Sequence, residues 1–313
     1  MRKCNAGRRL SLLFLFSFLF LFLTRLQIGQ AAAVPFAFNG GRAFQDLQHV
    51  VAFGPRPVGS KALDATRAWI IGQLKRDGCK VVQDPFVGDT PLGKIPMVNL
   101  IAELPGTQPN RIVMIAGHYD TKLEKSFRFV GANDGGSSTA FLLELARELQ
   151  PTKHRLTYWI VFFDGEEALK HWTDSDSLYG SRQLAAKLTA NGNLSRIQAM
   201  ILVDMIGDAH LGIQQDQAST SWLNKLIWQQ ADKLGYSGYF LKSRPVSMVD
   251  DHIPFVNAGV SAVDLIDFDY GPDNRYWHTA QDVIQHCSPS SLTIVGRVVK
   301  ATLAALENSP HVQ

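Results

Sequence analysis

Residues 156–163 (LTYWIVFF) are branched and aromatic with no polar alternation, which is the pattern of a strand buried on both faces of a sheet. Shorter runs predict further strands, three of them buried and two at an edge, at residues 111–116, 199–203, 260–266, 81–86 and 98–104. Intervening segments with apolar residues at helical spacing predict helices at residues 44–52, 63–74, 138–149, 221–234 and 288–306.

The regular alternation of strand and helix contains no internal repeat and no long low-complexity linker, which favours one α/β domain. We therefore expect a three-layer architecture, in which an open, twisted, mostly parallel sheet is flanked by helices. In such sheets the chemistry lies in the loops just beyond the carboxyl ends of the strands.

Polar residues follow three of the predicted buried strands at the point where each apolar run ends. His118 follows the first, the adjacent pair Glu166 and Glu167 follows the second, and Asp204 ends the third. Taken singly, each has an ordinary explanation as a turn or capping residue. Parallel strands bring these ends to one edge of the sheet, however, so their joint occurrence indicates a site.

The side chains at this edge are typical of an open zinc site built from imidazole and carboxylate ligands. A Cys-x-x-Cys pair is absent from the sequence, which excludes a thiolate site of that kind. Adjacent glutamates point in different directions, so one can bind a metal while the other carries protons. The candidate ligands are His118, Asp134, Glu167, Asp204 and His278.

The first 33 residues differ from the rest of the chain. A basic start, an apolar block at residues 10–23 and the small residues Ala31 to Ala33 predict a secretory signal peptide, hence a secreted or periplasmic protein. Retention as a membrane anchor is the alternative, although the block is short for a span of about 20 residues. Residues 34–313 would then form a single catalytic domain, for which we expect a monomer.

Charge and cysteine content indicate which binding partners and which disulfides the chain could have. Five of the 31 Lys and Arg residues and none of the 28 Asp and Glu residues lie in the leader, so the remainder carries 26 basic and 28 acidic residues. This balance gives no reason to expect a nucleic-acid partner. Beyond the leader only Cys79 and Cys287 remain, and the sequence leaves open whether they pair.

The motifs carry a resemblance to two related groups of enzymes. The five candidate ligands and a glutamate base resemble the zinc aminopeptidases of family M28. Longer blocks are similar to the animal-type glutaminyl-peptide cyclotransferases, or glutaminyl cyclases, at residues 163–168 (FDGEEA), 171–172 (HW), 176–182 (DSLYGSR), 202–207 (LVDMIG), 250–255 (DDHIPF) and 277–279 (WHT). The resemblance spans nearly the whole chain beyond the leader.

The resemblance implies a role for each matching residue. Asp134, Glu167 and His278 would hold one zinc ion per chain. Glu166 would be the general acid and base, with Asp204 and Asp250 in a hydrogen-bonded acidic network beside it. Trp172 and Trp277 would line the pocket for glutamine. His118 and Asp120 match the second-metal region of the aminopeptidases, where a second zinc is not expected in a cyclase.

The implied reaction closes the N-terminal glutamine of a peptide or protein to pyroglutamate and releases ammonia. Nucleophile and electrophile are already tethered in the substrate, so the site has only to fold the side chain back. Zinc would polarise the γ-carbonyl, while Glu166 would move a proton from the α-amine to the departing nitrogen. Aromatic walls would keep water away.

Two alternatives remain open from the sequence. One is an M28-type zinc aminopeptidase in which His118 and Asp204 hold a second metal. The other is a metal-free binding domain, which is disfavoured because every candidate ligand and the base are present. Val249 also departs from the cyclase pattern, in which a polar residue is typical, and this puts one substrate hydrogen bond in doubt.

Overall fold

The fold is built around one eight-stranded sheet with the strand order β1-β2-β4-β3-β5-β8-β6-β7. A computed structural model describes Met1 and residues 36–312, so the predicted signal peptide lies almost wholly outside the described residues. The strands are β1 (Lys80–Thr90), β2 (Gly93–Leu104), β3 (Gln108–His118), β4 (Leu156–Phe163), β5 (Ile197–Asp204), β6 (Ile213–Asp216), β7 (Phe240–Val246) and β8 (Ala262–Ile266).

The centre of the sheet is parallel, antiparallel pairs flank it on both sides, and the outermost pair β6–β7 is again parallel. Strands β4, β3, β5 and β8 pair in parallel, whereas β1 with β2, β2 with β4, and β6 with β8 pair antiparallel. The expectation of an open sheet flanked by helices is confirmed, and the three antiparallel pairs make it a mixed sheet. The four parallel strands therefore all present their carboxyl ends at the same edge.

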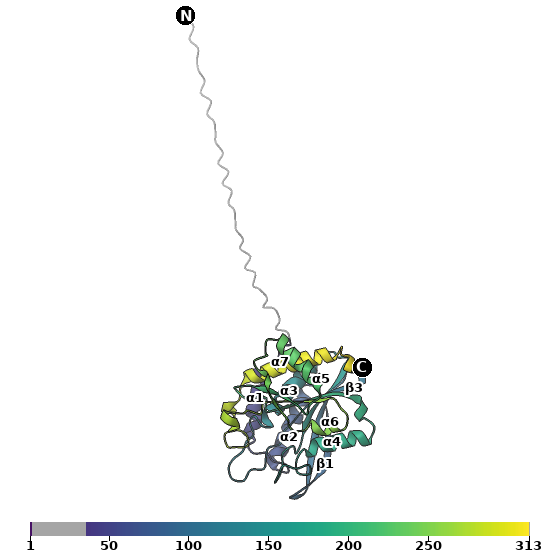
Figure 1. The fold of residues 1–313 in the computed structure, drawn as a ribbon, viewed down its shortest axis with the longest axis vertical. Helices are drawn as coiled ribbons and strands as arrows, with labels where there is room; N and C mark the ends of the chain where they lie inside the picture. Colours follow the sequence, from purple (N-terminus) through teal and green to yellow (C-terminus); the bar gives the residue numbers. More distant parts are fainter. Residues whose placement is uncertain (2–35, 313) are drawn as a thin grey trace. The chain divides into compact units, whose positions relative to one another are not determined.

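Helices cover both faces of the sheet, as Figure 1 shows for the part of the chain drawn as ribbon. Within residues 36–312 the α-helices are α1 (Gly40–Ala52), α2 (Lys61–Arg76), α3 (Gly136–Leu149), α4 (Tyr179–Ala190), α5 (Ser221–Lys233), α6 (Ile253–Asn257) and α7 (Pro289–Leu306). Apolar side chains of α2, α3, α5 and α7 join the core on one face, and those of α4 and α6 join the core on the other.

Alternate residues of β4 fill the two cores. Tyr158, Ile160 and Phe162 belong to the core beneath α3 and α7, and the intervening Trp159, Val161 and Phe163 belong to the core beneath α4 and α6. Every residue of β4 is buried because both faces of the sheet are covered. This explains the absence of polar alternation in its sequence and confirms the three-layer expectation.

The described part of the chain contains no helix with both the length and the apolarity needed to cross a bilayer. The cysteines Cys79 and Cys287 are both buried and both free.

Candidate metal centre and active site

The edge where the central strands end gathers the acidic and histidine side chains. His118 is the last residue of β3, Asp204 is the last residue of β5, and Glu166 and Glu167 lie three and four residues beyond the end of β4. Asp134 lies in the turn just ahead of α3. The parallel pairing of β3 with both β4 and β5 brings these ends together, as the strand-end pattern predicts.

Asp134, Glu167 and His278 lie close enough to share one metal ion, each offering an atom within 4.8 Å of the other two. His278 Nε2 lies 3.2 Å from Asp134 Oδ2 and 3.1 Å from Glu167 Oε1. The three residues come from segments far apart in the sequence and were predicted together only through the family resemblance. We call them the pocket triad.

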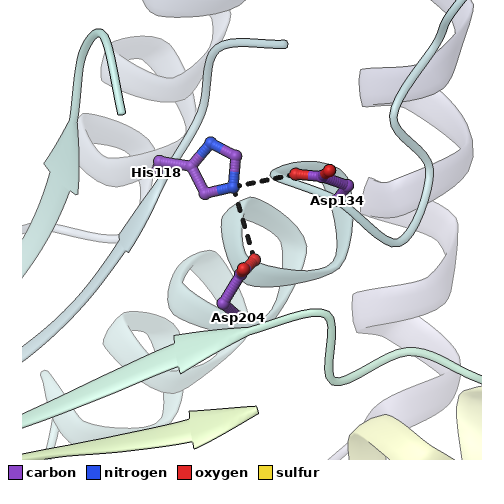
Figure 2. A group of neighbouring side chains, drawn as sticks. All are labelled: His118, Asp134 and Asp204. Carbon is purple, nitrogen blue, oxygen red and sulfur yellow. Dashed lines mark ion pairs between the residues drawn. The ribbon is translucent and has the colours of Figure 1, made fainter. Parts of the chain in front are cut away.

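A second group, the buried triad, consists of His118, Asp134 and Asp204 and meets the same criterion. His118 Nε2 lies 3.2 Å from Asp134 Oδ1 and 3.3 Å from Asp204 Oδ1, and Figure 2 shows both carboxylates on the same side of the ring. Asp134 therefore belongs to both triads and turns a different oxygen toward each histidine.

The burial, spacing and donor atoms of the pocket triad all fit a zinc ion. Both carboxylate oxygens of Glu167 are buried and accept no hydrogen bond. Burying a carboxylate in this way costs free energy unless a cation binds next to it. Zinc–ligand distances of about 2.0–2.2 Å put tetrahedral ligand atoms about 3.4 Å apart, close to the separations found around His278. Imidazole and carboxylate are suitable donors.

Glu166 and Asp250 border the triads and, like Asp204 of the buried triad, are nearly inaccessible to solvent. Burial raises the pKa of Glu166 well above its ordinary value; His118 opposes this rise, and the charge of Asp250 adds to it. Burial, followed by the charge of Asp204, raises the pKa of Asp250 to about 7. Burial also raises the pKa of Asp204, against the effect of His118. A raised pKa of this kind suits a group that has to hold a proton and then give it up.

A cavity of about 330 Å³ opens onto these groups. Its mouth includes Trp172, which is 44% exposed, and Val249, which is 53% exposed. The Trp277 ring stacks on His278 with ring centroids 4.0 Å apart and meets the Phe268 ring edge-on at 4.9 Å. The remaining lining residues are Lys122, Asp134, Glu166, Glu167, Asp204, Met205, Met248, Asp250, Ile266 and His278.

Asp120 lies behind the site rather than in it. Its two carboxylate oxygens accept the backbone N–H groups of Glu166, at 3.1 Å, and of Glu167, at 3.3 Å. One of these oxygens also lies 3.5 Å from His118 Nδ1. Asp120 thus fixes the direction in which the two adjacent glutamates leave the backbone.

Sequence reasoning did not identify Lys122, Met248 and Phe268 as pocket residues. Lys122 Nζ lies 3.8 Å from Glu167 Oε2. None of the three carries a motif, and each enters the lining through loop geometry. The backbone is strained here as well, because Met205 and His278 have φ values of 49° and 52°. Such non-glycine conformations cluster at functional sites.

Comparison with known proteins supports the relationship that the motifs suggested. Residues 99–303 match the model of peptidase family M28. The glutaminyl-peptide cyclotransferase of Drosophila melanogaster is 32% identical over 274 residues, covering 78% of this chain and 76% of the relative.

Two solved structures are similar over most of their length. A glutaminyl cyclase from an Acidobacteriales bacterium has a TM-score of 0.83 and 38% identity, covering 89% of this chain and 98% of that one. A Zn-dependent exopeptidase from Parabacteroides distasonis has a TM-score of 0.77 and 26% identity, covering 88% of this chain and 100% of that one.

Proposed function

The chain belongs to peptidase family M28, within which it is an enzyme of the glutaminyl-peptide cyclotransferase type, and we propose that it works with one zinc ion held by the pocket triad. The observation that carries the proposal is the position of this triad at the floor of an aromatic-walled cavity, next to the additional buried carboxylate of Glu166. When bound, zinc would act as a Lewis acid that polarises the γ-carbonyl of the substrate glutamine.

The aromatic side chains orient the substrate. Trp172, Trp277 and Phe268 present flat apolar surfaces around a cavity whose floor is acidic. A glutamine side chain that enters amide first would fold back between these walls, so that its α-amine approaches the carbonyl carbon (Cδ) of its own side chain. Because ring closure is intramolecular, this orientation supplies a large share of the rate enhancement. The walls also restrict water, which would otherwise compete with the amine as the nucleophile.

Glu166 moves the proton. The α-amine forms a bond to Cδ, the carbonyl carbon of the side-chain amide, and Glu166 takes a proton from the nitrogen as the bond forms. The bond from Cδ to the amide nitrogen then breaks, Glu166 returns the proton to that nitrogen, and ammonia leaves. A raised pKa suits both steps, since the same group accepts and then donates. The neighbouring carboxylate of Asp250 helps to raise the pKa of Glu166, and Asp204 in turn raises the pKa of Asp250.

The direct test is to incubate the purified protein with a Gln-initiated peptide and to follow ammonia release together with the mass of the peptide. We expect stoichiometric ammonia and a product that has lost one ammonia. Release of free amino acids from the same peptide, without cyclisation, would replace the proposal with the aminopeptidase alternative.

The buried triad is the observation that favours the aminopeptidase alternative, because a two-metal enzyme needs a second set of ligands sharing Asp134. The number of bound zinc ions separates the two functions. One tightly bound zinc per chain supports the cyclase, whereas two, together with amino acid release, would support the peptidase.

We also propose that residues 1–33 form a signal peptide and that residues 34–313 act as the exported catalytic domain, as a monomer. The basic start and short apolar block support export. N-terminal sequencing of the protein recovered outside the cytoplasm should begin close to residue 34. Recovery of the intact leader in the membrane fraction would instead show an anchor, and light scattering would test the monomer.

A further inference from the structure

Asp282 has no part in the cavity, yet its carboxylate contacts the backbone on which a candidate metal ligand lies. The residue is 1% exposed. Its Oδ1 accepts the backbone N–H of Asn133 at 2.7 Å, and its Oδ2 accepts that of Asp134 at 3.2 Å. The Tyr270 hydroxyl donates to Oδ1 at 3.1 Å. A carboxylate this buried is stable only with such donors around it.

The turn that Asp282 holds is irregular backbone. Gly131 and Gly135, on either side of Asp134, have left-handed φ values of 50° and 71°. Gly135 is the N-cap of α3 and brings no side-chain cap to the first turn. In the described part of the chain, Asp282 is the hydrogen-bond acceptor of both amides. The position of Asp134 therefore depends on Asp282.

The same carboxylate belongs to the segment of another ligand. Asp282 follows His278 by four residues, and its own N–H donates to the Thr279 carbonyl at 3.2 Å. His278 has a strained φ of 52°, so its conformation needs support from its surroundings. Tyr270 adds a third connection, because it precedes His278 in the same loop.

We propose that Asp282 is a positioning residue for the metal set, tying the Asp134 turn to the loop that carries His278. The inference rests on the proposed function, since it presumes that the pocket triad binds zinc. Through the two backbone amides, Asp282 keeps Asp134 Oδ2 at 3.2 Å from His278 Nε2. Residues that orient metal ligands in this indirect way typically contribute about 10–100-fold to metal affinity.

Asp176 offers a matched comparison because it is built in the same way with a different target. Its oxygens accept the backbone N–H groups of Leu169, Lys170 and His171 at 2.9–3.0 Å, and the Tyr179 hydroxyl donates to it at 2.8 Å. It is 3% exposed. The loop that Asp176 holds leads into Trp172, at the cavity mouth, and contains no candidate metal ligand.

The experiment compares the zinc affinities of the wild-type chain, Asp282→Asn, Tyr270→Phe and Asp176→Asn by competition with a chromogenic chelator. Asparagine keeps the volume of aspartate but turns an NH2 group toward one of the two amides. We expect the zinc Kd to rise about 10–100-fold for Asp282→Asn and by a smaller factor for Tyr270→Phe, which loses one donor of three. Asp176→Asn should keep the wild-type zinc Kd and raise the KM for peptide.

Controls separate positioning from a general loss of structure. Far-UV circular dichroism and thermal unfolding of the zinc-free proteins establish that each variant folds, and the absorption spectrum of the Co²⁺-loaded protein reports on ligand geometry. A changed spectrum in folded Asp282→Asn is the expected outcome. If Asp282→Asn does not fold, Tyr270→Phe carries the same test.

Equal zinc affinity and an unchanged Co²⁺ spectrum in folded Asp282→Asn would overturn the inference and leave the proposed function standing. An equal loss of zinc affinity in Asp176→Asn would also overturn it, because the effect would then be general to buried carboxylates. A wild-type chain that binds no zinc would remove both proposals together.

Discussion

The sharpest prediction concerns Glu166→Gln. Glutamine has nearly the same shape as glutamate but cannot exchange a proton in this role. The backbone N–H of residue 166 is held by Asp120, and that contact does not involve the side chain that changes. Glu167, the adjacent candidate ligand, is held by the other oxygen of Asp120. The substitution should therefore remove proton transfer and leave the zinc site intact.

The expected loss follows from the surroundings of Glu166. General acid–base catalysis contributes about 10²–10⁴-fold, and here one group serves both the amine and the leaving nitrogen. Its side chain is only 8% exposed, so bulk water is a poor substitute. Asp250, which also lines the cavity and whose pKa is raised to about 7, is a candidate to take over part of the role. We expect kcat to fall by about 10³-fold, which corresponds to about 4 kcal/mol in the activation barrier.

The assay is continuous detection of ammonia from a Gln-initiated peptide at saturating concentration, with zinc content measured on the same samples. Glu167→Gln is the matched control, because it alters the neighbouring residue and should lose zinc as well as activity. Activity of Glu166→Gln within tenfold of wild type, with zinc bound, would show that another group carries the proton. Loss of zinc from Glu166→Gln would show that Glu166 is a ligand.

Three further outcomes test other parts of the structure. Dialysis against a chelator should abolish turnover, and one equivalent of zinc per chain should restore it; a requirement for two would contradict the single-zinc proposal. Trp172→Ala should raise KM about tenfold, the equivalent of about 1.4 kcal/mol, with kcat little changed, as steady-state kinetics will show. Gly117→Ala should lower the free energy of unfolding by about 1–3 kcal/mol in urea titration, because the added Cβ would lie 2.7 Å from Ser138 Cβ. Unchanged stability would mean that β3 and α3 shift apart at no cost in free energy.

The sequence predicts the centre of the fold well and its far edge poorly. Strand β4 is predicted because burial on both faces favours branched and aromatic residues along its whole length. Strands β6 and β7 escape prediction because β6 has only four residues, mostly polar, and β7 contains Pro245 and is largely exposed. Of the two, β7 lies at the edge of the sheet, where backbone hydrogen bonds to one neighbour hold the strand and leave no pattern in its side chains.

The residues of the candidate site also divide into those that the sequence pattern predicts and those that it does not. His118, Glu166 and Asp204 are visible in the sequence because a polar residue directly after a buried strand stands out. His278 lies outside any strand, so no strand end marks it, and only the family resemblance selects it with Asp134 and Glu167 from the five candidate ligands. Asp282 could not be found at all, because it acts on backbone amides 148 and 149 residues away and carries no motif.

The two triads differ in what can reach them, and this bears on the choice between cyclase and peptidase. The His278 side chain is 17% exposed and lines the cavity, whereas the His118 side chain is 2% exposed and lies behind it. Both His118 nitrogens already face carboxylates, Nε2 toward Asp134 and Asp204 and Nδ1 toward Asp120. A substrate amide entering the cavity would therefore meet the pocket triad first. Since cyclisation needs a single polarised carbonyl beside one proton carrier, the accessible half of the site is sufficient for it.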